Sequence, residues 1–458
     1  MEIVDLFLAP TYLLFIFFFA IVYRSKALKG ANISKFFLPG LALKCFGAIV
    51  AGLIYKFYYG TGDTFTYYTA SKYLNEIINV NFDHWWSAIT NSSQGNIAST
   101  YLDIRVIQYD KTFFFVKMCS WLGLISFNNY TVIALFLAVF SFATSWKFYK
   151  MCCDLYPKMW KTMGYIVFYI PSVIFWGSGL FKDTITYGSI LLLTASFYFA
   201  FHKKDRVVYH LFLMLMSAYF LQNIREFLLI TILPPLIIWY VLQFKNVIRS
   251  AKVRFLIGPV FAIVGIAGGT LVISSLTSSD EQLKTQNLKD KSKGFQQWHS
   301  SEGAGGSSYT LGDMDYTNIG IIKKIPAAIN VTLFRPYLFE VRNPVMLIAG
   351  IESLFFLFLT LGVIKEVKFG VFLYFFDNAN VFFFLLFSLV FAFVAGFNSY
   401  NFGALVRYKI PCMPYFLIGI YIMKYEILQT KERRMNERRI AIEEEEKRLN
   451  AQLSPIAQ

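Results

Sequence analysis

Long apolar runs alternate with short polar connections along most of this chain. Each run has roughly 17–25 residues, which is enough for an α-helix to cross a hydrocarbon core of about 30 Å. The pattern therefore predicts an all-α, polytopic membrane protein with about eleven transmembrane helices. The predicted spans are residues 4–23, 36–58, 129–147, 163–180, 184–201, 207–223, 226–243, 254–276, 344–364, 371–396 and 404–423.

The loops between these spans differ in charge, and the difference predicts an orientation. Loops rich in lysine and arginine resist translocation and stay on the cytoplasmic side of a membrane. The pattern therefore places the N terminus outside and the C terminus in the cytoplasm, in a cell inner (cytoplasmic) membrane. Every second loop is basic, and the groups are Arg24 to Lys35, Lys147 to Lys161, Lys203 to Arg206, Lys245 to Arg254, and Lys365 with Lys368.

Two long connections fall on the predicted outer side, at about residues 59–128 and 277–343. The first contains an apolar stretch, 113–127, that is short for a span and includes Lys117. Counting this stretch as a span would invert every later loop, so we predict a juxtamembrane helix lying at the outer surface. Residues 319–343 predict a second interfacial helix before the next span.

Composition agrees with a membrane protein and excludes one class of partner. Hydrophobic residues make up 56% of the chain and charged residues 16%, with a mean hydropathy of +0.50, outside the range of soluble domains. The net charge of +15 is spread over alternate loops, which indicates contact with anionic membrane lipid and no nucleic acid partner. The five cysteines lack disulfide or metal-ligand spacing and are expected to be apolar fillers.

The chain divides into a transmembrane domain, residues 1–424, and a charged tail, residues 425–458. The tail mixes basic residues with the run Glu443 to Glu446, and few apolar positions recur at a coiled-coil period. We expect a solvated cytoplasmic helix that docks a cytoplasmic partner. A noncatalytic assembly subunit is therefore one function that the sequence leaves open.

Ionisable side chains recur near the outer ends of the predicted spans. Such residues are costly at membrane depth, so they face cavities or one another, and this layer is the candidate site. Guanidinium groups bind phosphate with two parallel hydrogen bonds and suit a lipid-linked substrate. The alternative is that each extends into the headgroups or forms an ion pair. The candidate substrate-binding residues are Arg105, Lys182, Arg225, Arg335, Glu340 and Arg407.

Asp63 is the first candidate for catalysis because it opens the first outer loop, within Gly62-Asp63-Thr64. A carboxylate in this place has the chemistry of a general base toward an acceptor hydroxyl. Its alternative role is to cap the helix predicted to follow it, for which aspartate is well suited. The sequence identifies no cofactor, and it leaves open whether a divalent metal assists Asp63.

Residues 58–70 read YYGTGDTFTYYTA and are similar to the first outer loop of GT-C type integral membrane glycosyltransferases, a superfamily to which exopolysaccharide repeat-unit polymerases are similar in outline. In that family an acidic residue followed by aromatics opens the loop. Residues 112–130 resemble the family's juxtamembrane helix, and residues 171–183 resemble a span ending in an outer turn with an acidic residue. Two features depart from the pattern: this loop has one acid where a pair is frequent, and two spans precede it.

The resemblance implies a GT-C-like fold and a transferase that takes a sugar from a polyprenyl-phosphate-linked donor at the outer face. It implies that Asp63 is the catalytic base, that Asp183 is a second acidic residue of the active site, and that Arg225, Arg335 and Arg407 contact the lipid phosphate. The acceptor is a glycan, a lipid or a protein, and the sequence does not choose among them. A phosphate loop of the GxGxxG or Walker type on the cytoplasmic side is absent from the sequence, which favours a lipid-linked donor over a nucleotide-linked one.

The second hypothesis is a transporter or flippase for a lipid-linked or anionic substrate, which also needs arginines and many spans. Transporters of this kind have internal repeats and broken helices near the midplane. No repeat is evident, but Pro234-Pro235 and the glycines from Gly265 to Gly269 are able to interrupt helices. Glu352 falls inside a predicted span and is a proton-relay candidate under this hypothesis, and otherwise a buried structural residue.

Overall fold

The computed structural model of this chain describes residues 5–91, 109–243, 307–312, 318–368 and 370–453, and within these ranges every regular element is a helix. The predicted all-α class is therefore confirmed for the described residues. Seven of the described helices are long and apolar enough to cross a membrane, which makes the chain a helical membrane protein. They are Phe7–Ala27, Asn32–Tyr59, Tyr130–Leu155, Lys182–His202, Val207–Gln243, Pro344–Val367 and Ala379–Ser399.

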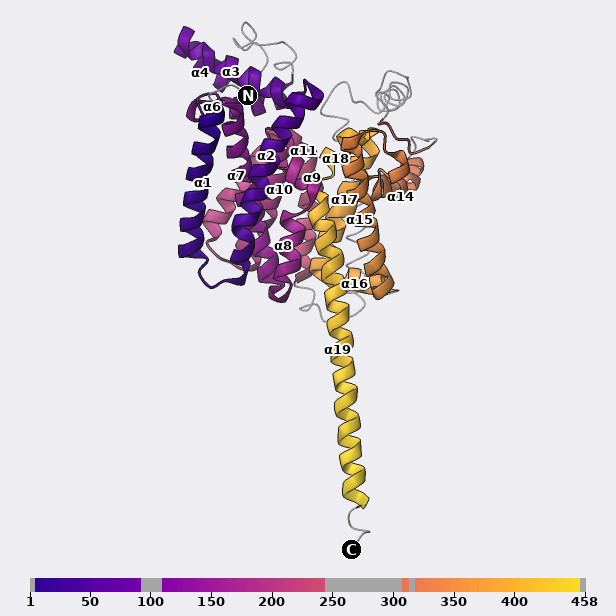
Figure 1. Ribbon diagram of the computed structural model, residues 1–458. Coiled ribbons are helices and arrows are strands. Elements are labelled where there is room, and N and C mark those ends of the chain that lie inside the picture. Colours follow the sequence, from indigo (N-terminus) through magenta and orange to yellow (C-terminus); the bar gives the residue numbers. More distant parts are fainter. Residues whose placement is uncertain (1–4, 92–108, 244–306, 313–317, 369, 454–458) are drawn as a thin grey trace.

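The helices form a bundle with two distinct ends (Figure 1). We call the end that carries α3 (Asp63–Val80) and α18 (Phe402–Tyr408) the upper end, and the end from which α19 (Cys412–Leu453) projects the lower end. The chain begins at the upper end and finishes beyond the lower end. The other long helices of the bundle are α1 (Asp5–Ala27), α2 (Phe37–Ile54), α7 (Tyr130–Leu155), α10 (Lys182–Phe197), α11 (Val207–Gln243), α15 (Pro344–Val367) and α17 (Ala379–Ser399).

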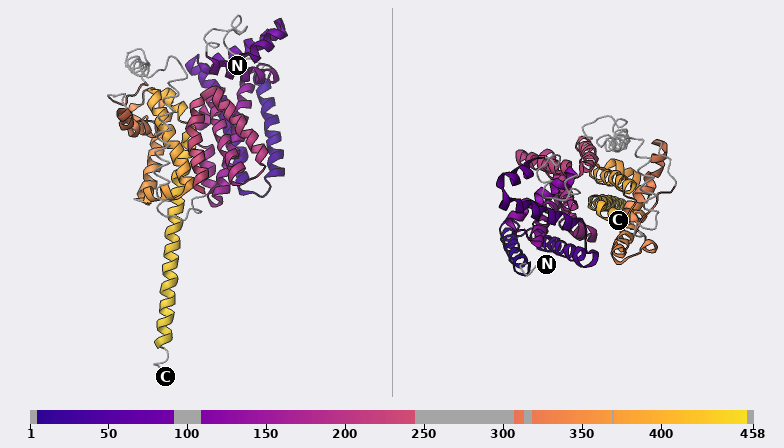
Figure 2. Two further views of the ribbon diagram at one scale, coloured as in Figure 1. Left: turned by 180° about the vertical axis from the view of Figure 1, so that it is seen from behind. Right: turned by 90° about the horizontal axis from the view of Figure 1, so that it is seen from above.

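The first and second halves of the chain occupy different sides of the bundle, as the view from above shows (Figure 2). Helix α10 packs against α7 and α11 in the first half, while α17 packs against α19 and α14 (Asn318–Phe334) in the second. Helix α11 also contacts α17 and so joins the halves. In α14, Thr332 donates to the carbonyl of Ala392 on the upper part of α17 (2.7 Å).

Helix α11 contains a reversal at Arg225, whose backbone is not helical (φ −150°, ψ 79°). Near one end of α11, His210 stacks on Phe199, and near the other end Trp239 stacks on Tyr198. Both partners lie in the π-helical turn Tyr198–His202, which directly follows the lower end of α10, whereas Arg225 pairs with a residue at the upper end of α10. The chain therefore rises through 207–224 and descends through 226–243, with the turn between the two segments that the sequence predicts as separate spans.

Other predicted spans are interrupted, and 254–276 lies outside the described residues. The stretch 163–180 is divided into α8 (Trp160–Phe168) and α9 (Pro171–Trp176), because Pro171 has no N–H to continue a helix. The stretch 371–396 is divided into α16 (Gly370–Asp377) and α17, where Asn378 caps the second helix. The stretch 404–423 is divided between α18 and α19.

Three helices form a layer over the upper end of the first half: α3, α4 (Phe82–Thr90) and α6 (Asp110–Ile125). Helix α6 occupies the stretch for which the sequence predicts a juxtamembrane helix. Buried Asn75 of α3 donates to the carbonyl of Ser120 in α6 (3.0 Å) and to Asn128 (2.6 Å). These hydrogen bonds hold α3 against α6 and fix the direction in which α3 leaves the bundle.

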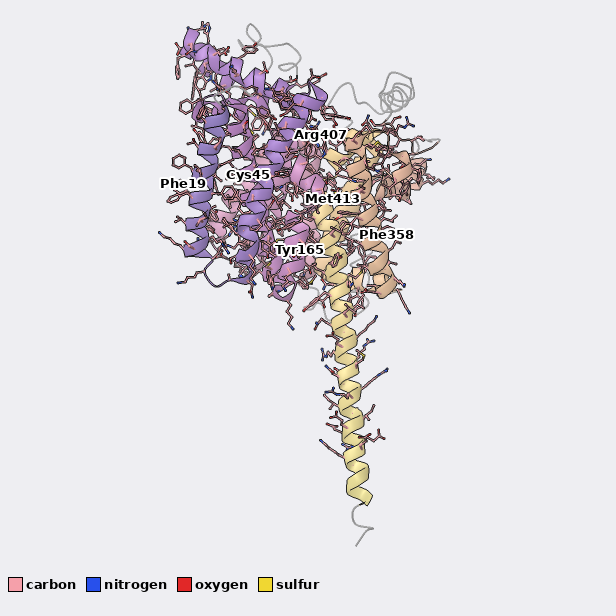
Figure 3. All side chains as sticks on the ribbon, viewed as in Figure 1. Phe19, Cys45, Tyr165, Phe358, Arg407 and Met413 are labelled. Carbon is pink, nitrogen blue, oxygen red and sulfur yellow. The ribbon has the colours of Figure 1, made fainter. Side chains whose placement is uncertain are left out.

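The flanks of the bundle carry large apolar side chains. Phe19, Tyr165 and Phe358 project from its sides in Figure 3, with exposed fractions of 65%, 59% and 63%. Exposure of this kind suits helices surrounded by lipid, where the backbone hydrogen bonds are internal and the side chains meet acyl chains. Beyond the bundle, α19 continues as a single charged helix with the ion pairs Arg433–Glu437 and Arg439–Glu443 between successive turns.

Candidate functional site

Asp63 is the first residue of α3, and the residues on either side fix its position. Gly62 has φ +143°, and a side chain there would meet the ring of Tyr55 at 2.4 Å, so only glycine fits. Thr64 is fully buried and shares a hydrogen bond with the hydroxyl of Tyr130 (2.8 Å). These contacts fix the conformation of the turn at Gly62-Asp63-Thr64 and with it the position of the Asp63 carboxylate. Its side chain is 53% exposed.

Asp183 lies in the first turn of α10 and is buried, with 1% of its side chain exposed. Arg407 of α18 donates to one of its oxygens, Oδ2, through Nε (3.1 Å) and Nη2 (2.9 Å). The same guanidinium donates through Nη1 to Oδ2 of Asp63 (2.9 Å). Arg407 thus joins the two aspartates that the sequence predicts as catalytic, although they are 120 positions apart in the chain. Figure 3 shows Arg407 at the upper end, above Met413.

Arg225 supplies the second cation of the site from the turn inside α11. Its Nη2 lies 2.6 Å from Oδ1 of Asp183, so each oxygen of this buried carboxylate has a guanidinium partner. The next residue, Glu226, pairs with Lys111 of α6 (2.9 Å). The non-helical backbone at Arg225 is what allows these neighbours to point to different partners.

Lys182 adds a third cation beside Asp183. Its amine donates to Oγ1 of Thr112 in α6 (2.7 Å) and lies 5.2 Å from the ring centroid of Tyr67 in α3. Burial raises the pKa of the Tyr67 hydroxyl, and the charge of Asp63 raises it further. Lys182 therefore links α10 to α3 and α6 of the upper layer.

Aromatic rings pack against the guanidinium groups of Arg407 and Arg225. The Cζ atom of Arg407 is 5.2 Å from the ring of Trp176 and 5.5 Å from the ring of Phe181, and that of Arg225 is 4.4 Å from the ring of Tyr408. Rings in these positions attract the cations and restrict their side-chain rotation. These aromatic residues were not predicted from the sequence to belong to the site, although Tyr408 and Phe181 are direct neighbours of charged candidates in the chain.

We call the group Asp63, Asp183, Lys182, Arg225 and Arg407 the charge cluster. It contains three cations and two carboxylates, so it has a net positive charge when all five groups are ionised. Only Asp63 is more than half exposed; the two arginine side chains are 15% and 16% exposed. The cluster is therefore preorganised and partly desolvated, with Asp63 as its most exposed member, and its net charge suits an anion.

Arg335 and Glu340 form a separate ion pair outside the charge cluster. The Nε atom of Arg335 donates to both carboxylate oxygens of Glu340 (3.1 and 3.0 Å), and the backbone N–H of Tyr337 donates to Oε2 (2.8 Å). Burial raises the pKa of Glu340, but the bonds from Arg335 and Tyr337 outweigh it, and the pKa lies below its usual value. In the structure, these two predicted substrate-binding residues therefore form an ion pair with each other.

The remaining predictions for the site concern Arg105 and a metal. Arg105 lies outside the described residues. Among the residues that the structure describes, no group of three or more histidine, cysteine or acidic side chains has the arrangement of a metal site. The five cysteines are free and buried, at Cys45, Cys119, Cys152, Cys153 and Cys412.

The short helix α9 leads into the charge cluster and is held at both ends by buried ionisable side chains. At its first turn, the N–H of Ser172 donates to Oε2 of Glu352 (2.7 Å). At its end, the amine of Lys44 donates to the carbonyls of Val173 and Gly177 (3.1 Å each). An acid at the start and a cation at the end of a helix both oppose its dipole favourably. Glu352 was a candidate from the sequence, but Lys44 was not. The observation that would have identified Lys44 is its position as an ionisable residue inside an apolar run.

The fold and the site define a helical membrane protein with an anion-suited charge cluster at one end of its bundle. No protein-family model, no curated protein and no solved structure matches this chain.

Proposed function

We propose that this protein is a membrane glycosyltransferase or glycan polymerase that takes a sugar from a polyprenyl-phosphate-linked donor. The observation that carries the proposal is the convergence of Arg225 and Arg407 on buried Asp183, with the exposed carboxylate of Asp63 paired to Arg407 beside them. Loss of a lipid phosphate from the sugar develops negative charge on the departing oxygen. Fixed cations at that position stabilise the transition state more than the ground state.

The geometry supports a division of roles within the charge cluster. Asp183 is buried and saturated by two guanidinium groups, so in this proposal it is a positioning residue that holds the arginines. Asp63 is the general base, because it is exposed to an incoming acceptor hydroxyl. Arg407 uses three N–H groups on the two aspartates, and a guanidinium has five, so two are left for a phosphate oxygen.

The proposal includes an orientation in the membrane. The lower ends of α1, α7, α10 and α15 adjoin the basic connections. Lysine and arginine residues, which resist translocation across the membrane, are therefore concentrated at the end from which α19 projects. In this proposal that end is cytoplasmic, the charge cluster lies at the outer face of the cytoplasmic membrane, and the full chain has a GT-C-like bundle of about eleven spans.

A transporter of lipid-linked or anionic substrates is the second candidate, and one observation favours it. Helices α8 and α9 are a broken pair within the bundle, and buried charges from Glu352 and Lys44 hold α9. Discontinuous helices with charged residues at their ends are a feature of transporter sites. The charge cluster would then bind the anionic group of the cargo.

Reconstitution distinguishes the two candidates. The purified chain is placed in vesicles with lipid-linked sugars extracted from the membranes that natively contain it, and the sugar is radiolabelled. A transferase forms a labelled glycan with new covalent bonds and releases the polyprenyl phosphate. Movement of intact lipid-linked sugar across the bilayer with no new glycan would reject the transferase and support transport.

A further inference from the structure

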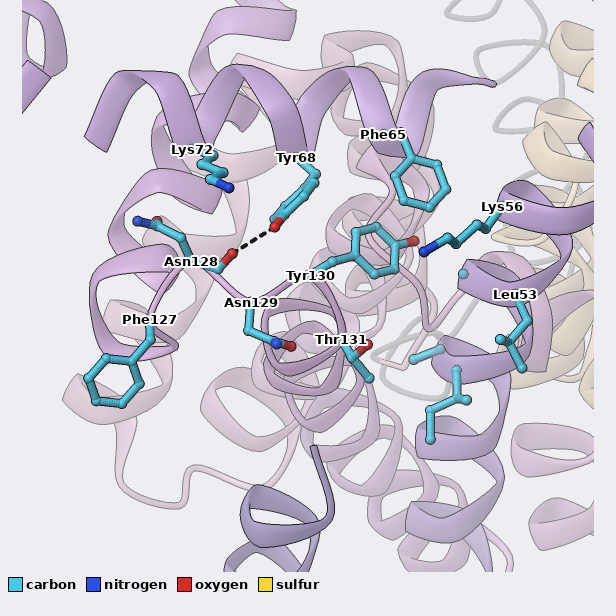
Figure 4. Close-up of a pocket in the computed structure, with 13 residues that line it drawn as sticks. Leu53, Lys56, Phe65, Tyr68, Lys72, Phe127, Asn128, Asn129, Tyr130 and Thr131 are labelled. Carbon is cyan, nitrogen blue, oxygen red and sulfur yellow. Dashed lines mark hydrogen bonds between the residues drawn. The ribbon is translucent and has the colours of Figure 1, made fainter. Parts of the chain in front are cut away.

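A cavity of about 240 Å³ lies at the upper end, between α2, α3 and the start of α7. Figure 4 shows Lys72, Tyr68 and Phe65 of α3 above it, Lys56 at one side, and Tyr130 between them. The rings of Phe65 and Tyr130 stack at 4.8 Å, and Tyr68 donates to the carbonyl of Asn128 (2.8 Å). These contacts give the cavity fixed walls.

The cavity has a positive charge that nothing in its walls neutralises. Its lining includes Lys56 and Lys72 and neither aspartate nor glutamate. Within the described part of the chain, neither lysine forms an ion pair. Helix α7 begins at Tyr130, so the positive end of its dipole adds to the field of the two amines. An anion is the ligand that this arrangement suits.

This cavity is separate from the charge cluster, because the two lie on different faces of α3. Phe65, Tyr68 and Lys72 follow the spacing of one helical face and line the cavity. Asp63 and Tyr67 lie on the opposite face and contact Arg407 and Lys182. Helix α3 is therefore a partition between two positively charged sites.

We propose that the cavity binds the phosphate headgroup of a membrane lipid, whose chain runs down the side of α2. A volume of about 240 Å³ accommodates a headgroup and not a whole lipid. Ile49 and Leu53 of the α2 span form the apolar wall below the lysines. Phe127, which is 76% exposed, also lines the cavity and offers an apolar surface to a lipid. The site does not depend on the proposed transfer reaction.

The test is native mass spectrometry of the full-length purified chain with dioleoyl phosphatidic acid, and with dioleoyl phosphatidylcholine as the lipid without net charge. A lysine near an anionic surface contributes about fivefold in binding, so Lys56→Gln/Lys72→Gln is expected to weaken the tightest phosphatidic acid binding about 25-fold. Lys56→Arg/Lys72→Arg retains it. The matched control, Lys158→Gln/Lys161→Gln, alters two exposed lysines at the lower end and leaves it unchanged.

The remaining arms identify the source of the phosphate. If inorganic phosphate displaces the lipid at equal concentration, the lipid chain adds nothing and a lipid ligand is refuted. Equal binding of phosphatidic acid by the wild type and the double glutamine variant, or equal binding of both lipids by the wild type, also overturns the proposal. Should the double variant unfold, Lys56→Gln alone carries the test, since it changes an exposed side chain and is expected to weaken binding about fivefold.

Discussion

Replacing Asp183 with asparagine tests the electrostatic core of the charge cluster. The substitution keeps the size of the side chain but removes the charge that Arg225 and Arg407 share. Breaking a buried ion pair by removing one partner costs roughly 3–5 kcal/mol, because the other charge stays buried without compensation. Both arginines are about 15% exposed and keep some contact with water, so we expect a cost near the lower end, about 3 kcal/mol.

A thiol-reactive fluorescent dye measures this cost in detergent, since all five cysteines are free and buried and react only when the chain unfolds. For a chain of this length, about 3 kcal/mol corresponds to a fall in Tm of about 3 °C. The matched control is Asp83→Asn, an exposed aspartate in α4, for which we expect a cost below about 0.5 kcal/mol.

Adding Arg225→Met to Asp183→Asn removes one uncompensated guanidinium, and we expect the double variant to recover part of the lost Tm. A Tm for Asp183→Asn within about 1 °C of the Asp83→Asn control would show that Asp183 is not the counter-ion that holds the two arginines. A double variant less stable than the single one would also contradict the argument.

Three further predictions concern the surroundings of the charge cluster. Gly62→Ala forces a methyl group against the ring of Tyr55 and strains the backbone by about 1–3 kcal/mol. The Tm is therefore expected to fall further than for Gly60→Ala, where φ is also positive (+70°) but no atom lies near the new side chain. Equal Tm values for the two variants would refute this. A double-mutant cycle on unfolding free energy gives Asp63 and Arg407 a coupling of about 0.5 kcal/mol, because Asp63 is 53% exposed; a coupling above about 2 kcal/mol would contradict it. Glu340 has a lowered pKa, so its contribution to stability is present above the ordinary value of 4.5 and is lost as pH falls below it. The Tm of the wild type therefore falls more steeply below pH 4.5 than that of Glu340→Gln, and parallel curves would exclude this role.

The sequence predicts the helical class because apolar length and loop charge are local properties. It also predicts the turn inside α11, since a polar step with Arg225 separates two apolar runs. Pro171 is a local signal that divides 163–180, although the prediction treats this stretch as one span. The sequence does not predict how the resulting short helix is held, because Glu352 and Lys44 come from distant parts of the chain.

The candidate site shows a similar limit. The hydropathy pattern gives the depth of a residue along the bundle axis, so it places Asp63, Asp183, Arg225 and Arg407 in one layer, and the structure brings them together. The pattern contains no information about position around the bundle. Arg335 was therefore grouped with the other arginines, although in the structure it pairs with its own neighbour, Glu340.

The central claim is that Asp63 acts as a base in sugar transfer, and its neutral isostere tests this most directly. Asp63→Asn and the control Asp83→Asn are expressed at equal membrane abundance, and glycan product is measured in reconstituted vesicles with lipid-linked sugar. Removing a general base lowers the rate by about 10²–10⁴-fold, so the account predicts loss of product for Asp63→Asn and normal product for the control. Product formation by Asp63→Asn at the rate of the wild type would contradict it.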